Sequence, residues 1–392
     1  MEVDHTQLLL ILLIGIVAPL IAEMPSGFRL PVVVIEIVLG ILIGPHGLGL
    51  MEVGGVVELL AQLGLAFLLF LVGLEIDLSR IHGRPLVLAA KAWGVAVLAA
   101  AVLTSVLGVM GILPAPPLVV AIAVTTTALG VLMPILRDSG ELETSFGMLV
   151  VALAAVSEFG PLVVISLVLA PTHSPVVHTL FVAGFLVAAF FAASFAVRMR
   201  SSPWIESLGH TLESSSQLPV RACVLLQILL VALAEKFGLH MVLGAFAAGM
   251  IVRLASEGEK GVLLRQKLDA LGYGYLIPLF FISVGMNFDV AALVSSPLAP
   301  VQIVAYLGLF LAVRGAALFL YEDEIDTNHR WPFLLYTATG LPLIVVISEL
   351  GTANGILDSE QAAALVSAGM ISVLLFPLLA SFLLRKARVS PP

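Results

Sequence analysis

Few charged residues stand inside the long apolar stretches of this sequence, and these residues are the first candidates for chemistry. Glu158 lies near the middle of an apolar stretch over 146–170, directly after Ser157, and Arg314 lies near the middle of another over 300–320. A charged side chain at the bilayer centre costs about 2.5–3.5 kcal/mol even on the lenient insertion scale. A buried carboxyl can hold either a proton or a cation, a serine hydroxyl can add an oxygen ligand, and an arginine can balance the charge.

Each of these residues also has a structural interpretation. Glu158 can be a hydrogen-bonded packing residue, Ser157 a small packing residue, and Arg314 a side chain that reaches the membrane surface or a cavity. Glu36 lies about a turn and a half into a second stretch, where it can bind an ion or pair with a base or a helix end. The remaining acidic and histidine side chains considered, which we place near stretch ends or loop edges, are Glu235, Glu349 and His240.

Two threonine-rich segments predict interruptions in the helices that carry them. The hydroxyls of Thr and Ser can bond their own backbone, Pro removes a donor, and Gly relaxes the chain. Two such interruptions crossing near the midplane would offer half-helix ends and free carbonyl oxygens to an ion, although each segment can also be a simple kink. The candidate crossing residues are Thr125, Thr337, Thr339 and Gly340, and the candidate ion ligands beside Glu158 and Ser157 are Thr126 and Thr127.

The composition places these residues in a membrane. The chain has 392 residues, of which 60% are hydrophobic and 11% charged, where soluble domains carry roughly 25% charged residues. Apolar stretches of about 20 residues recur along the whole chain, which predicts an all-helical polytopic membrane protein of about thirteen spans. Their approximate limits are 6–23, 30–45, 57–76, 86–108, 117–136, 146–170, 176–198, 218–235, 239–255, 270–286, 300–320, 331–350 and 361–384.

The basic residues predict the orientation of these spans. Almost all of them fall in or beside the odd-numbered connections or the C-terminal tail, and Lys236 alone falls in an even one. The positive-inside rule then places the N-terminus outside and the C-terminus in the cytoplasm. The first stretch follows acidic residues and has no small-residue cleavage signal, so we expect a retained span in the inner membrane.

Three pairs of similar segments predict an inverted repeat. The members of each pair lie seven spans apart, and because seven is odd the two copies must face opposite ways. Spans 1–6 and 8–13 would form the two halves, with span 7 as a linker. The pairs are 38–44 with 242–249, 72–77 with 284–289, and 125–130 with 337–342.

Several functional classes are disfavoured. The lone Cys223 excludes a disulfide framework or a thiolate metal site. The net charge of -8 and the short basic runs give no sign of nucleic-acid binding. No Gly-rich turn is followed by Lys and Ser or Thr in a soluble segment, so no ATP-binding loop is expected. We expect no enzyme activity, no cofactor, no catalytic residues and no resident metal.

The sequence resembles the monovalent cation:proton antiporter-2 family over nearly its whole length. In that family the sixth span carries a polar pair whose second acid binds the ion, and Ser157-Glu158 stands at that place. Arg314 corresponds to the lysine that pairs with the core acids. The segments that carry the resemblance are Leu30-Pro31 to Gly44-Pro45, 67–77, 125–131, 137–142, 244–249 and 278–286.

The resemblance implies a homodimer that exchanges a monovalent cation (Na⁺, K⁺ or Li⁺) for H⁺ by alternating access, with Glu158 as the carrier. It divides the chain into a dimerisation panel over 1–80 and 200–290, an ion-translocating core over 86–170 and 300–385, and a linker helix over 171–199. One carboxylate beside a permanently charged Arg314 favours electroneutral exchange. The alternatives are a channel-like or regulated potassium efflux system and a solute:cation symporter of related fold.

Overall fold

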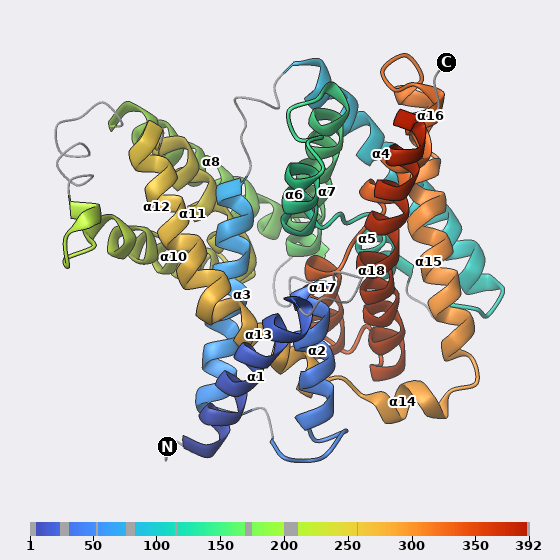
Figure 1. Cartoon of the computed structure of the whole chain (residues 1–392), viewed down its shortest axis with the longest axis horizontal. Coiled ribbons are helices and arrows are strands. Elements are labelled where there is room, and N and C mark those ends of the chain that lie inside the picture. The colour runs from blue at the N-terminus through green and yellow to red at the C-terminus, as the bar shows by residue number, and fades with distance from the viewer. Residues whose placement is uncertain are drawn as a thin grey trace. The chain divides into compact units, whose positions relative to one another are not determined.

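The computed structural model describes residues 5–23, 31–51, 54–75, 83–113, 117–168, 175–199, 211–256 and 258–389. Within these ranges every regular element is a helix and no strand occurs (Figure 1). Leu30 and the last two residues of the 72–77 motif lie outside the described residues.

The first half of the described chain runs from α1 to α8, and the second from α10 to α18. The first set is α1 (His5–Glu23), α2 (Val32–Ile43), α3 (Gly55–Glu75), α4 (Arg84–Val109), α5 (Pro117–Ala123), α6 (Leu129–Asp138), α7 (Ser145–Val168) and α8 (Pro175–Met199). The second set is α10 (Leu218–Lys236), α11 (Met241–Ala255), α12 (Gly258–Leu271), α13 (Ile277–Met286), α14 (Val290–Ser295), α15 (Ala299–Gly315), α16 (Thr327–Thr337), α17 (Pro342–Ala353) and α18 (Ser359–Val389). Short turns η1 (Thr211–Glu213), η2 (Gly272–Leu276) and η3 (Leu318–Tyr321) complete the order.

The helices have the length and composition of a membrane protein. Among the described residues, 7 helical segments are long and apolar enough to cross a bilayer, and α2, α11 and α15 are among the shorter apolar helices. The predicted class of an all-helical, multi-pass membrane protein is therefore confirmed. The count of about thirteen spans stays a prediction.

The structure corrects two predicted boundaries. We predicted a connection between 255 and a span beginning at 270, but α12 already begins at Gly258 and continues through the π-helical turn η2 into α13. Glu, Lys, Arg and Gln are good helix formers, whereas hydropathy marks only the apolar part of a helix. The predicted span over 300–320 ends as an α-helix at Gly315, and a short 3₁₀ turn follows.

The chain forms two compact units, which we describe separately. Unit 1 comprises residues 1–77 and 166–287, and unit 2 comprises 78–165 and 288–392. The assignment of a dimerisation role to one unit and an ion-translocating role to the other stays a prediction.

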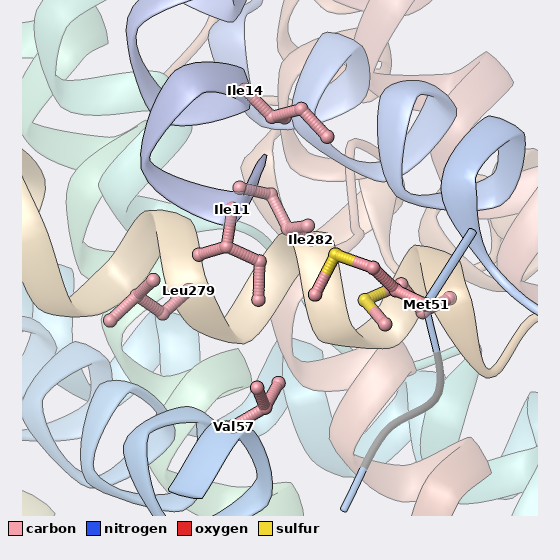
Figure 2. Close-up of a cluster of buried hydrophobic side chains, with 7 residues drawn as sticks. Ile11, Ile14, Met51, Val57, Leu279 and Ile282 are labelled. Atoms are coloured by element: carbon pink, nitrogen blue, oxygen red, sulfur yellow. The ribbon is translucent and has the colours of Figure 1, made fainter. Parts of the chain in front are cut away.

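One part of the core of unit 1 lies where α1 meets α13 (Figure 2). Ile11 of α1 and Ile282 of α13 are buried against each other's helix, and Met51 and Val57 come from the residues around the start of α3. Since lipid tails are as apolar as these side chains, close packing rather than the hydrophobic effect must hold such helices together.

Glycines allow α2 and α13 to lie in direct backbone contact. A Cβ atom added to Gly40 would lie 2.2 Å from the carbonyl oxygen of Ile282, and one added to Gly285 would lie 2.1 Å from that of Ile37. Both distances are far below van der Waals contact. Any side chain at these positions would force the two helices apart.

The same arrangement holds α3 against α11. A Cβ atom added to Gly249 would lie 1.9 Å from the carbonyl oxygen of Phe70, and one added to Gly73 would lie 2.2 Å from that of Phe246. Small residues at close helix crossings are typical of membrane interfaces, because they bring backbones together.

We expect Gly249→Ala to destabilise unit 1. The new methyl group would meet backbone atoms of Phe70 and Leu74, which cannot rotate away, so overpacking should cost about 1–3 kcal/mol. A thermal unfolding experiment in detergent should show a lower Tm. Gly15→Ala is the control, since no atom lies within 4 Å of the added Cβ there. Equal Tm values for the two variants would contradict the expectation.

Unit 2 is built around α18. This helix packs along α15 and α16 (Figure 1), and it also contacts α17, while α5 packs against α4 and α17. The short helices α5, α6, α16 and α17 form two interrupted pairs inside this frame. Glu158, Ser157, Arg314 and the predicted crossing residues all lie in unit 2.

Candidate functional site

The first threonine-rich segment interrupts a helix. The α-helix α5 ends at Ala123 and α6 begins at Leu129. The hydroxyl of Thr125 donates to the carbonyl of Ile122 at 2.7 Å, and the hydroxyl of Thr126 donates to that of Ala123 at 2.8 Å. Side-chain bonds of this kind compete with the regular helix bonds. These side-chain hydrogen bonds are a reason for α5 to end at Ala123.

The second segment interrupts another helix in the same way. Between the last residue of α16, Thr337, and the first of α17, Pro342, the chain is not helical. The hydroxyl of Thr339 donates to the carbonyl of Leu335 at 2.9 Å. Pro342 has no N–H, so the carbonyl of Ala338 cannot receive the bond that a continuous helix would give it.

The two interruptions contact each other. The amide of Ala128 donates to the carbonyl of Thr339 at 2.8 Å, and the hydroxyl of Thr127 donates to the carbonyl of Thr337 at 2.6 Å. A Cβ atom added to Gly340 would lie 3.3 Å from the carbonyl oxygen of Thr126. Unit 2 therefore brings the two non-helical segments side by side, and all of their threonines are buried.

Glu158 meets this crossing from α7. Its side chain is 2% exposed, and its Oε2 accepts a hydrogen bond of 3.1 Å from the amide of Leu129, the first residue of α6. Free amides and the partial positive charge at a helix N-terminus stabilise a negative charge there. The Glu158 carboxyl therefore lies at the N-terminus of α6, beside the first interruption.

Arg314 of α15 fastens α7 to the first interruption. Its Nη1 donates to the hydroxyl of Ser157 at 2.9 Å, and its Nη2 donates to the hydroxyl of Thr127 at 2.8 Å and to the carbonyl of Thr125. Its Nε is buried without a hydrogen-bond partner in the described part of the chain. The flat guanidinium fork suits several acceptors at once, so Arg314 acts as a clamp as well as a charge.

Ser372 of α18 contacts the second interruption, and the sequence did not reveal this residue as a candidate. Its hydroxyl accepts a 3.1 Å hydrogen bond from the amide of Gly340 and lies 3.0 Å from the carbonyl oxygen of the same residue. A single serine in an apolar helix carries no spacing signal. Only the fold brings it to the crossing.

The other acidic candidates lie on α2, α10 and α17. Glu36 is buried in α2 of unit 1, whereas Glu235 and Glu349 are exposed near the ends of α10 and α17. Glu158 and Arg314 both bond residues at the first interruption, Glu158 through the Leu129 amide and Arg314 through the Thr125 carbonyl.

An all-helical membrane fold in which two interrupted helices cross beside a buried carboxyl is typical of secondary transporters. The family model described as "Sodium/hydrogen exchanger, transmembrane" matches residues 8–386, and the chain belongs to this family. The family resemblance expected from the sequence is thus confirmed.

Curated relatives carry the same kind of name. YjbQ of Bacillus subtilis (strain 168), whose name describes a Na(+)/H(+) antiporter, is 27% identical over 396 residues, which cover 95% of this chain and 62% of YjbQ. Cation/H(+) antiporter 17 of Arabidopsis thaliana is 30% identical over 93% of this chain and 47% of its own length. The chain therefore spans only about half to three fifths of these relatives.

A solved structure shares the fold. The sodium proton antiporter MjNhaP1 from Methanocaldococcus jannaschii, determined at pH 8, aligns with a TM-score of 0.67 over 96% of this chain and 95% of its own. The sequence identity is 15%, so this likeness concerns the fold alone.

Proposed function

We propose that this protein is a secondary active antiporter that exchanges a monovalent cation for H⁺. The observation that carries the proposal is the buried Glu158 carboxylate, which meets the N-terminus of α6 at the crossing of the two interrupted helices. One carboxylate can bind a proton or a cation in turn but not both at full strength, which is what coupled exchange requires. The names of the curated relatives support the same activity.

The cation would be held by oxygen atoms around Glu158. The neighbouring candidates are the carbonyl and hydroxyl oxygens of Thr126 and the hydroxyl of Thr127, which all belong to the first interruption. Ser157 would act through Arg314, to which its hydroxyl is bonded. Oxygen ligands suit hard cations, and free carbonyls of an unwound segment are a usual source of them in transporters.

The proposal includes an inverted repeat of spans 1–6 and 8–13 within about thirteen spans. The glycine contacts support this repeat, because matching residues are separated by equal intervals in the sequence. The interval from Gly40 to Gly249 equals the interval from Ile37 to Phe246. The step from Gly73 to Gly285 likewise equals the step from Phe70 to Ile282. The contact of Gly40 with Ile282 therefore corresponds to the contact of Gly249 with Phe70. The contact of Gly285 with Ile37 likewise corresponds to the contact of Gly73 with Phe246.

The two interruptions in unit 2 are separated by the same sequence interval as Gly73 and Gly285. Thr337 follows Thr125, and Thr339 follows Thr127, by the number of residues that separates Gly73 from Gly285. Packing in unit 1 and helix breaks in unit 2 thus support one common repeat.

We further propose the division of labour that the family resemblance implies. Unit 2 would carry the ion and unit 1 would form the homodimer, with the two moving against each other in alternating access. The protein would lie in the inner membrane with its N-terminus outside and its C-terminus in the cytoplasm.

Exchange in liposomes tests the function and its charge balance. A pH-sensitive dye inside the vesicles should report proton movement when Na⁺, K⁺ or Li⁺ is added in turn. Since Ser157 does not ionise and Arg314 keeps its charge, we expect one cation to exchange for one proton. An imposed potential, worth about 2.3 kcal/mol per charge per 100 mV, should then leave the rate unchanged.

Other outcomes would point to other mechanisms. Acceleration by one sign of the potential would contradict one-for-one exchange and indicate a second proton carrier, for which Glu36 is the first residue to test. Cation flux without proton movement would indicate a channel. Flux only with an organic solute would indicate a symporter.

A further inference from the structure

The second interruption is held by one serine of α18. Ser372 is fully buried, and its hydroxyl lies against both polar atoms of Gly340: the amide donates to it at 3.1 Å and the carbonyl oxygen accepts from it at 3.0 Å. The carbonyl of Gly369, one turn earlier on α18, is also within reach at 2.8 Å. A serine hydroxyl has one proton, so it donates to one of these two carbonyls at a time.

Gly340 lies between α18 and the first interruption. A Cβ atom added to Gly340 would lie 3.3 Å from the carbonyl oxygen of Thr126, and one added to Gly369 would lie 3.1 Å from the carbonyl oxygen of Gly340. The Gly340 backbone therefore fits tightly on both sides. Ser372 supplies hydrogen bonds to this backbone where a regular helix is absent.

A short chain of contacts leads from Ser372 to the carboxylate. Gly340 follows Thr339, whose carbonyl accepts from the amide of Ala128. Ala128 precedes Leu129, whose amide donates to Glu158. We therefore expect a change in the position of Gly340 to alter the position of the Leu129 amide, which bonds Glu158.

Ser372 and Glu158 make comparable contacts in the two proposed repeats. Glu158 comes from the sixth span, α7, and accepts from the amide of Leu129. Ser372 comes from the thirteenth span, α18, and accepts from the amide of Gly340. One interruption is thus held by a group that titrates and the other by a neutral hydroxyl.

We propose that Ser372 is a positioning residue of the cation site, which holds the second interruption in the geometry that Glu158 needs. This inference rests on the proposed antiport function and adds a residue to it. Ser372 holds this geometry by fixing the Gly340 backbone and, through the Thr339–Ala128 contact, the Leu129 amide that bonds Glu158. The role is therefore in the geometry of the Glu158 site, and the KM for the cation is the quantity that reports it.

The test is Ser372→Ala in reconstituted vesicles. The buried amide and carbonyl of Gly340 would lose their partner, and we expect the KM for the cation to rise on the order of tenfold, with little change in the maximal rate. Ser372→Thr keeps the hydroxyl and should restore most of the affinity. Ser367→Ala is the matched control, because Ser367 is a buried serine of the same helix and should leave the KM unchanged.

The measurements separate this inference from the proposed function. If Glu158→Gln in the same vesicles retains exchange, the proposed function fails. If Glu158→Gln abolishes exchange while Ser372→Ala keeps the wild-type KM, the role of Ser372 alone is overturned. Should the alanine variant not fold, Ser372→Cys puts a slightly larger thiol with weaker hydrogen bonds in place of the hydroxyl, and a wild-type KM there overturns the inference equally.

Discussion

Glu158→Gln is expected to abolish cation:proton exchange while the protein still folds. Glutamine has the shape of glutamate, and its amide oxygen can still accept the hydrogen bond from the Leu129 amide, which now measures 3.1 Å to Oε2. It removes only the charge that titrates. Because a neutral amide neither releases a proton nor balances a monovalent cation, both halves of the exchange should stop together.

The measurement is cation-driven proton movement in vesicles, compared with the Tm of the purified protein. The exchange rate should fall to that of protein-free vesicles, and the Tm should stay close to the wild-type value. Glu349→Gln is the control, since Glu349 is an exposed carboxylate of α17 in the same unit. Normal transport by Glu158→Gln would place the carrier elsewhere, and Glu36→Gln would then be the next variant to measure.

The charged part of the site was visible in the sequence for a physical reason. Ionisable side chains are so costly in a bilayer that few are present by chance, so Glu158 and Arg314 stand out in apolar stretches. A helix cannot easily continue through the threonines that follow Val124 or through the threonines, glycine and proline of Thr337 to Pro342, so both segments could be recognised as interruptions. The structure interrupts the helices at these two segments.

The neutral part of the site could not be predicted in the same way. Ser372 and the Leu129 amide matter only through their contacts across helices, and neither residue type is unusual in an apolar helix. The sequence suggested Arg314 as a charge partner, but its hydrogen bonds to Ser157, Thr127 and the Thr125 carbonyl depend on how α15 packs. Charge cost is a property of one residue, whereas hydrogen-bond partners are a property of the fold.

Helix length was underestimated for a related reason. Hydropathy detects where a helix is apolar, so the charged first turns of α12 were interpreted as a connection. Helix propensity would have extended this helix, because Glu, Lys, Arg and Gln form helices well. The π-helical turn at Gly272–Leu276 follows no rule of apolar spacing and was not predicted.

The second large effect is expected for Arg314→Ala, which should destabilise unit 2. The guanidinium now bonds α7 through Ser157 and the first interruption through Thr127 and the Thr125 carbonyl, and all of these groups are buried. Removing the guanidinium leaves buried polar groups such as the Ser157 hydroxyl and the Thr125 carbonyl without this donor, at a cost of about 1–3 kcal/mol for each. A fall in Tm on the order of 10 °C should follow for a unit of this size.

Arg314→Lys separates the clamp from the charge. Lysine keeps the positive charge but has a single nitrogen, which cannot span acceptors on two elements as the planar fork does. We therefore expect an intermediate Tm and slower exchange. Arg137→Ala is the control, because Arg137 is an exposed arginine of α6 in the same unit. A wild-type Tm for Arg314→Ala would show that these hydrogen bonds do not stabilise the first interruption. Wild-type Tm and exchange for Arg314→Lys would show that the charge alone accounts for the role of Arg314.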